Sequence, residues 1–248
     1  MNRDEIRSYL EFYRDLGIDS VYRPVRQVRS AEPKAAAAKA AESPKISETI
    51  LLPTIAPTSD TLDQIRLDIG DCKRCRLSEA RNTIVFGSGN ERSTVVFVGE
   101  GPGADEDEQG LPFVGRAGHL LTQMIDNTAA KEGIPIRRSD VYICNVVKCR
   151  PPENRTPSPD EMQTCGQFLY RQLNTIKPKA ICALGSTAMK ALLNVKEGIT
   201  RQRGKWHKWQ DIPVMVTYHP SYLLRQYNQQ ARREAWEDLK TLFHFAYD

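Results

Sequence analysis

The sequence predicts an α/β fold in which helices cover a parallel sheet of four strands. Four short runs rich in β-branched and apolar residues alternate with segments whose apolar residues recur at helical spacing. Runs that are apolar throughout are typical of parallel strands buried on both faces. The predicted strands cover residues 93–100, 141–147, 179–185 and 212–219. Because strands alternate with helices, an α/β sandwich is the expected architecture.

Helical patterns fill the intervals between these strands. The segment 158–177 has the clearest start, because Ser158 suits an N-cap and Pro159 suits the first helical position. The other predicted helices cover residues 117–133, 186–194 and 228–246.

Three regions are expected along the chain. Residues 1–28 contain an amphipathic helical pattern, with Ile6, Tyr9, Leu10, Tyr13 and Leu16 on one face. Residues 29–61 are rich in Ala, Pro, Ser and Lys, which predicts a flexible linker. Residues 62–248 form the predicted globular domain.

Composition is that of an ordinary globular protein, with 40% hydrophobic and 27% charged residues among 248. No run reaches the ~20 apolar residues of a membrane span. The charged N-terminus lacks the apolar core of a secretory signal, so we expect a cytoplasmic protein.

Charge is distributed unevenly along the chain. Residues 63–147 carry 10 basic and 13 acidic side chains, whereas residues 148–248 carry 16 basic and 9 acidic side chains. The basic C-terminal part fits a polyanion partner, and equally a merely basic surface.

The six cysteines favour a metal site over disulfides, because nothing directs the chain to an oxidising compartment. Cys72 and Cys75 form a C-x-x-C motif, and Cys149 and Cys165 follow far downstream. Four thiolates can hold zinc or an iron–sulfur cluster, and spacing alone leaves the two open. The remaining two, Cys144 and Cys182, lie in apolar runs and are interpreted as buried strand residues.

Polar residues follow three of the predicted strands. Glu100 lies in the glycine-rich turn after the first strand, Asn145 near the end of the second and His219 after the fourth. The carboxyl ends of parallel strands meet at one edge of the sheet, where ligands bind. We therefore expect one pocket lined by these three residues. An Asn amide can read an imide edge, N–H beside C=O, as in uracil; the alternative is a capping Asn.

Other segments have both a ligand-binding and a structural interpretation. Phe113, in a loop bounded by Pro and Gly, could stack on a planar ligand or anchor the core. The stiff loop 149–161 offers donors to phosphate. The segment 199–209 interleaves basic and aromatic residues, which suits nucleic acid but also fits a β-hairpin.

Together these motifs resemble the family 4 uracil-DNA glycosylases, which contain iron–sulfur clusters. The matching segments span about residues 66–243 in family order: C-x-x-C (72–75), GEGPGADED (99–107), LPFVGRAG (111–118), NVVKCRPPENR (145–155), Cys165, RGKW (203–206) and HPSYLLR (219–225). The resemblance implies a three-layer sandwich with a central four-stranded parallel sheet. It also implies a 4Fe–4S cluster on Cys72, Cys75, Cys149 and Cys165.

The resemblance assigns roles residue by residue. Gly99, Glu100 and Gly101 form the turn against base and sugar, Phe113 stacks on uracil, Asn145 reads its N3–H and O4, and His219 donates to O2. Glu106 is implied to crowd C5 and so exclude thymine. DNA contacts are implied for Asn154, Arg155, Ser221, Leu223 and Arg225. Catalysis is assigned to Glu100, Asn145 and His219, with Asn145 and His219 dominant, because Gly101 stands where family 1 enzymes carry an Asp.

The expected function is that of a monofunctional uracil-DNA glycosylase, which flips uracil out of DNA and hydrolyses its N-glycosidic bond, initiating base excision repair. Expected partners are uracil-containing DNA, single- or double-stranded, and a replication or repair protein bound through the N-terminal extension. We expect a monomer and no membrane contact. Two alternatives are a DNA-binding iron–sulfur module without catalysis and an enzyme for another lesion, such as hypoxanthine. The sequence lacks the KRRIH insertion of the related uracil-crosslinking enzymes, so covalent trapping is not expected.

Overall fold

The computed structural model describes residues 60–248 except 194, 196, 226 and 227. The helix predicted within residues 1–28 lies outside the described residues, as does the linker predicted over 29–61 apart from Asp60 and Thr61. The first described helix, α2 (Leu62–Ile69), begins after Thr61, whose hydroxyl accepts a hydrogen bond from the main-chain N–H of Gln64.

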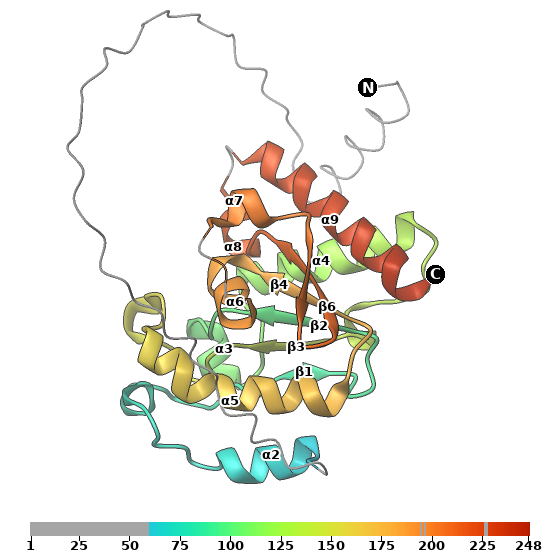
Figure 1. Cartoon of the computed structure of the whole chain (residues 1–248). Coiled ribbons are helices and arrows are strands. Elements are labelled where there is room, and N and C mark those ends of the chain that lie inside the picture. The colour runs from blue at the N-terminus through green and yellow to red at the C-terminus, as the bar shows by residue number, and fades with distance from the viewer. Residues whose placement is uncertain (1–59, 194, 196, 226–227) are drawn as a thin grey trace, which may run out of the picture.

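Within the described residues, six strands form one sheet in the order β1-β3-β2-β4-β6-β5 (Figure 1). The four central strands pair in parallel, which confirms the predicted core: β2 (Val95–Gly99), β3 (Tyr142–Asn145), β4 (Ala180–Leu184) and β6 (Ile212–Thr217). The edge strands β1 (Ser88–Gly89) and β5 (Trp206–Trp209) are antiparallel additions. β5 and β6 form a hairpin, so the end of the segment 199–209 is one strand of a hairpin, whereas residues 199–202 form a short helix.

Helices cover both faces of this sheet, which makes the expected three layers. One hydrophobic core lies between the sheet and the helices α2, α5 (Pro159–Ile176) and α6 (Gly185–Leu192). The other lies between the sheet and the helices α4 (Arg116–Lys131), α8 (Pro220–Leu223) and α9 (Gln229–Tyr247). The described helices α3 (Ala104–Gln109) and α7 (Ile199–Gln202) are short connections. No helix among the described residues is long and apolar enough to cross a membrane.

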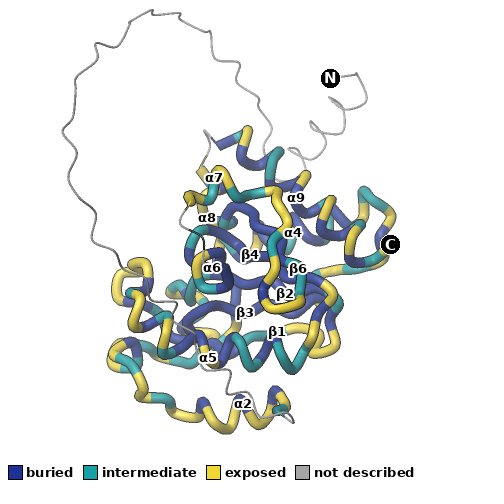
Figure 2. Tube along the Cα trace, in the orientation of Figure 1, coloured by how far each residue is buried: buried dark blue, intermediate teal, exposed yellow. Residues whose placement is uncertain are grey.

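The central strands are the most deeply buried part of the described residues (Figure 2). Every residue of β2, β3 and β4 is buried, as expected for apolar runs covered on both faces. Cys144 and Cys182 are fully buried in β3 and β4, which confirms their interpretation as core residues. Because β2, β3, β4 and β6 are parallel, Gly99, Asn145, Leu184 and Thr217 end at one edge of the sheet. That edge carries the pocket.

Candidate active site

A pocket of about 320 Å³ lies at the carboxyl edge of the sheet. The structure brings together here Glu100, Asn145 and His219, from the ends of three different strands. Other predicted site residues also line the pocket: Gly101, Glu106, Phe113, Asn154, Arg155 and Ser221. The remaining lining residues were not predicted as site residues: Pro102, Gly103, Ala117 and Pro151.

Asn145 is the buried polar group of this pocket. It is the last residue of β3 and only 1% exposed. Its side-chain Oδ1 and Nδ2 are both buried, and neither has a hydrogen-bond partner among the described residues. Buried amides are almost always satisfied, so one without a protein partner at a pocket marks a site where a bound molecule supplies its hydrogen bonds. Such a ligand must offer an acceptor beside a donor.

Gly99 allows this arrangement without lining the pocket itself. A Cβ on Gly99 would overlap Asn145 Oδ1 and lie 2.6 Å from the ring of Phe113. The bare main chain at the end of β2 therefore lets the amide and the ring approach each other.

Phe113 is held in an unusual backbone conformation. Its φ is +55°, a left-handed value that bulky residues rarely adopt. The ring is 7% exposed and lies 5.6 Å from the His219 ring, centroid to centroid, tilted by 35°. Strain of this kind persists only where the surroundings impose it, and it is concentrated at functional sites. Here Gly118 on α4 makes room for it, because a Cβ at that position would overlap the Phe113 carbonyl group.

We expect Gly118→Ala to lower the rate of the uracil excision that the sequence predicts by about 10-fold or more. The added Cβ pushes Phe113 out of the pocket, and a shift of about 1 Å can cost ~100-fold. Single-turnover kinetics measure the loss. Gly198→Ala is the control, because no atom lies within 4 Å of the position that its new Cβ would take. Equal rates for Gly118→Ala and the control would show that the Phe113 conformation is irrelevant.

His219 lines the same pocket and is held as a neutral hydrogen-bond donor. Its Nδ1 accepts a hydrogen bond from the main-chain N–H of Ser221 at 3.2 Å and lies 2.8 Å from Ser221 Oγ. Burial lowers the pKa of His219 from 6.5 to about 4. The ring is therefore neutral at pH 7, and because Nδ1 accepts, the proton resides on Nε2.

The two pocket glutamates differ in their surroundings. Glu106 accepts hydrogen bonds from the main-chain N–H groups of Gly103, Val114 and Gly115, at 3.0, 2.9 and 2.8 Å. It thus ties the loop after Phe113 to the start of α3. Glu100 accepts a hydrogen bond from the hydroxyl of Thr187 on α6. Thr187 has no sequence signal, because the contact joins residues 87 positions apart.

The predicted phosphate contacts lie on the rim. Asn154 is exposed with a φ of +54°, and its Oδ1 accepts from Arg150 Nε at 2.8 Å. Arg155 donates two hydrogen bonds to Glu161, at 2.6 and 2.8 Å, and Arg76 reaches the same carboxylate at 2.7 Å. These ion pairs hold the pKa of Glu161 well below its usual range. Arg155 is thus anchored while still lining the pocket.

Leu223, for which a DNA contact is expected, is 1% exposed and packs in the core with α4 and α9 in the protein without DNA. Its contact with DNA stays a prediction. Neighbouring Tyr222 is 40% exposed instead, and Arg225 is exposed with its guanidinium 5.9 Å from the Tyr222 ring centroid. The one-turn helix α8 turns Leu223 inward, and the sequence does not reveal this.

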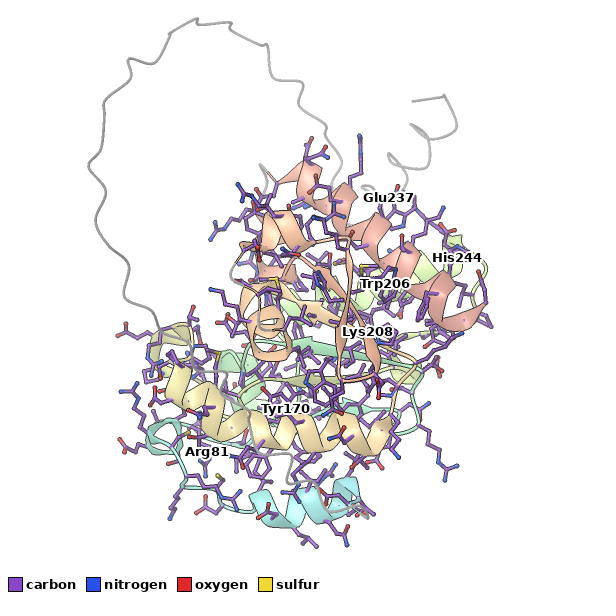
Figure 3. The ribbon with its side chains drawn as sticks, viewed as in Figure 1. Arg81, Tyr170, Trp206, Lys208, Glu237 and His244 are labelled. Atoms are coloured by element: carbon purple, nitrogen blue, oxygen red, sulfur yellow. The ribbon has the colours of Figure 1, made fainter. Side chains whose placement is uncertain are left out.

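The four candidate ligand cysteines gather beside α5. Cys149 and Cys165 are buried, and Cys72 and Cys75 are half-buried. Burial raises the pKa of Cys149, with smaller contributions from the neighbouring Cys75 and Cys72 thiols, and raises that of Cys165 to about 12, with contributions from Cys149 and Cys75. Two N–H groups point at sulfur: the main-chain N–H of Lys148 at 3.2 Å from Cys165 Sγ, and Arg81 Nη1 at 3.5 Å from Cys149 Sγ. Figure 3 labels Arg81 in this region, below α5.

The comparisons with known proteins agree with this geometry. A model of the uracil DNA glycosylase superfamily matches residues 86–240. The chain belongs to this superfamily, which agrees with the α/β fold described above. Within it, the chain is 48% identical over 171 residues to the type-4 uracil-DNA glycosylase of Thermotoga maritima, covering 68% of this chain and 86% of that protein. It is 42% identical over 191 residues to the type-4 uracil-DNA glycosylase of Archaeoglobus fulgidus, covering 74% and 92%.

Proposed function

We propose that this protein is a uracil-DNA glycosylase that binds a flipped uracil in the pocket at the sheet edge and hydrolyses its N-glycosidic bond. The observation that carries the proposal is the Asn145 amide, buried with both polar atoms unsatisfied. Uracil offers N3–H to Asn145 Oδ1 and O4 to Asn145 Nδ2. The ring of Phe113 lies against the same space and supplies a stacking surface.

The proposed reaction separates charge, and the pocket holds groups for both parts. As the bond from C1′ to N1 breaks, the sugar gains cationic character and uracil becomes an anion. The neutral His219 Nε2–H donates to uracil O2, where negative charge develops. Glu100 offers a carboxylate toward the cationic sugar or the attacking water. Gly101 carries no side chain, and a Cβ there would approach Val147 to 2.7 Å. Glu100 is therefore the general base that the turn of residues 99–101 offers.

Access to the pocket requires the nucleotide to leave the base stack, since the reactive atoms are otherwise inside the duplex. We propose that Asn154, Arg155, Ser221 and Arg225 contact phosphates or the opposed strand at the rim. We propose that Glu106 excludes thymine by crowding C5 of the bound base. Its carboxylate is fixed by three main-chain donors, and it acts as a rigid wall there.

A 4Fe–4S cluster is the proposed cofactor, held by Cys72, Cys75, Cys149 and Cys165. The donor set fits, because four thiols gather with N–H donors directed at two of the sulfurs. Within residues 60–248 as described, no group of three or more His, Cys, Asp or Glu side chains is arranged as a site for a single metal ion. When bound, the cluster ties the C-x-x-C segment to the segment 149–165.

We expect Cys165→Ser to lose bound iron and the broad visible absorbance of a cluster, because one of the four proposed cysteine ligands is removed. The variant should also unfold at a lower temperature. Iron analysis and thermal unfolding followed by circular dichroism measure both. Cys182→Ala is the control, since Cys182 is buried in β4 away from the ligand set. Full iron content in Cys165→Ser, or an equal loss of iron in Cys182→Ala, would contradict the ligand assignment.

The function is tested with an end-labelled oligonucleotide containing one uracil, beside matched thymine and hypoxanthine strands. We expect alkali-sensitive cleavage at uracil alone. Cleavage at hypoxanthine in preference to uracil would show an enzyme for another lesion. Intact DNA in all three arms, from a preparation loaded with iron, would favour a binding module without catalysis.

A further inference from the structure

Lys148 is a lysine whose side chain lies entirely inside the protein. It follows β3 by three residues and is 0% exposed. Its Nζ donates hydrogen bonds to the main-chain oxygen of Asn145 at 2.8 Å and to Gln172 Oε1 at 2.6 Å. Both acceptors are neutral amide oxygens, and in the part of the chain that the structure describes no carboxylate forms a salt bridge with Lys148.

This position is costly for a lysine. A buried ammonium is expensive even when it is paired, and an apolar side chain of the same length would fill the space more cheaply. Filling the core therefore does not by itself require a lysine here. Of the two hydrogen bonds that Nζ makes, the one to Asn145 reaches the residue with the unsatisfied amide.

The other end of the network is fixed by α5. Gln172 Nε2 donates to the main-chain oxygen of Phe86 at 3.0 Å and to the Tyr142 hydroxyl at 3.3 Å, so the glutamine cannot rotate freely. The main-chain N–H of Lys148 also donates to Cys165 Sγ. Cys165 and Gln172 lie seven residues apart on α5, about two turns, and so share one face of the helix. Lys148 thus contacts α5 at two points and Asn145 at a third.

We infer that Lys148 is a positioning residue for the base-reading amide: by holding the main chain of Asn145 to α5, it fixes the direction in which Oδ1 and Nδ2 face the base. The inference rests on the proposed function. It gives Lys148 no contact with the base, so its whole contribution to excision passes through Asn145.

The test is a double-mutant cycle measured under single-turnover conditions with enzyme in excess. Lys148→Met keeps an unbranched side chain, one atom shorter than that of lysine, and removes its donors. We expect a loss of excision of about 10- to 100-fold, the range for a displaced recognition group. Added to Asn145→Ala, the same change should cost little more, because the amide that Lys148 positions is already absent. Affinity for a matched thymine duplex should be unchanged, since that complex does not use the amide.

Two further variants separate positioning from folding. Gln172→Leu removes the second anchor of the lysine and should lower excision in the same direction, with no further loss in the Lys148→Met background. Leu173→Ala, on the same helix and in the same core, should lower the unfolding temperature while leaving excision at 25 °C unchanged. Iron content is measured for every variant, because Lys148 lies beside Cys149 and Cys165.

The outcomes are distinct. An equal loss on the wild-type and Asn145→Ala backgrounds would overturn the inference, as would full activity of Lys148→Met, or a loss that follows iron content. A wild-type protein that leaves uracil in DNA would instead refute the proposed function, before Lys148 is considered.

Discussion

Asn145→Ala is expected to lower kcat/KM for uracil excision by about 10²–10³, with the larger part in kcat. Removing one preorganised donor to a developing anion costs this much in other enzymes. In this protein the amide is buried with two unsatisfied atoms, so both recognition bonds to the uracil edge disappear together. The measurement is the single-turnover rate on a duplex with one uracil.

The matched control for this change is Asn90→Ala, an amide-to-methyl change in the turn after β1, where Asn90 Oδ1 accepts from the Arg92 main chain. We expect wild-type rates from it. A loss below about 3-fold for Asn145→Ala would contradict the assignment of this residue as the base reader.

His219→Ala is expected to lower kcat by a similar factor of about 10²–10³, because the donor to uracil O2 is lost. Glu100→Gln should cost less, since the carboxylate is engaged with Thr187 and acts on the sugar side. Ser221→Ala should cost least, because it keeps the main-chain N–H that orients the imidazole. If Glu100→Gln lost more activity than His219→Ala, the order of importance proposed here would be wrong.

The pH dependence follows from the same imidazole. His219 has a pKa of about 4 in the folded protein, below its ordinary 6.5, because burial disfavours the charged form. Protonation also breaks the hydrogen bond from Ser221 N–H to Nδ1. The His219-dependent rate should therefore be constant from pH 6 to 8 and fall as the pH drops through about 4. A midpoint near 6.5 that disappears in His219→Ala would contradict this.

Stability should change in the same window. Between pH 6.5 and 4 the unfolded chain binds a proton at His219 that the folded chain does not. This contribution to the free energy of unfolding is therefore fully present above pH 6.5 and is lost as the pH falls toward 4. Urea unfolding of the wild type and His219→Ala across this range measures it.

The sequence predicts the central sheet because its strands are buried on both faces and therefore apolar throughout. The edge strands are harder to predict. β1 has only two residues, and the mostly exposed basic and aromatic sequence of β5 is equally typical of a surface loop. The common pocket of Glu100, Asn145 and His219 is predictable because parallel pairing alone brings the carboxyl ends of the strands together.

What the sequence could not predict are partners distant along the chain. Thr187 beside Glu100, Glu161 between two arginines and Gln172 behind Lys148 are ordinary helix residues by pattern. The inward turn of Leu223 likewise depends on how α8 packs against α4 and α9. Each of these contacts is set by tertiary packing, which leaves no local trace in residue type or spacing.

The central claim is that the unsatisfied amide of Asn145 reads uracil, and a crystal structure of the protein with free uracil tests it most directly. The account predicts uracil against the ring of Phe113, with N3–H on Asn145 Oδ1, O4 on Asn145 Nδ2 and O2 on His219 Nε2. Uracil bound elsewhere, or bound in the pocket while both atoms of the Asn145 amide stay without a partner, would contradict it.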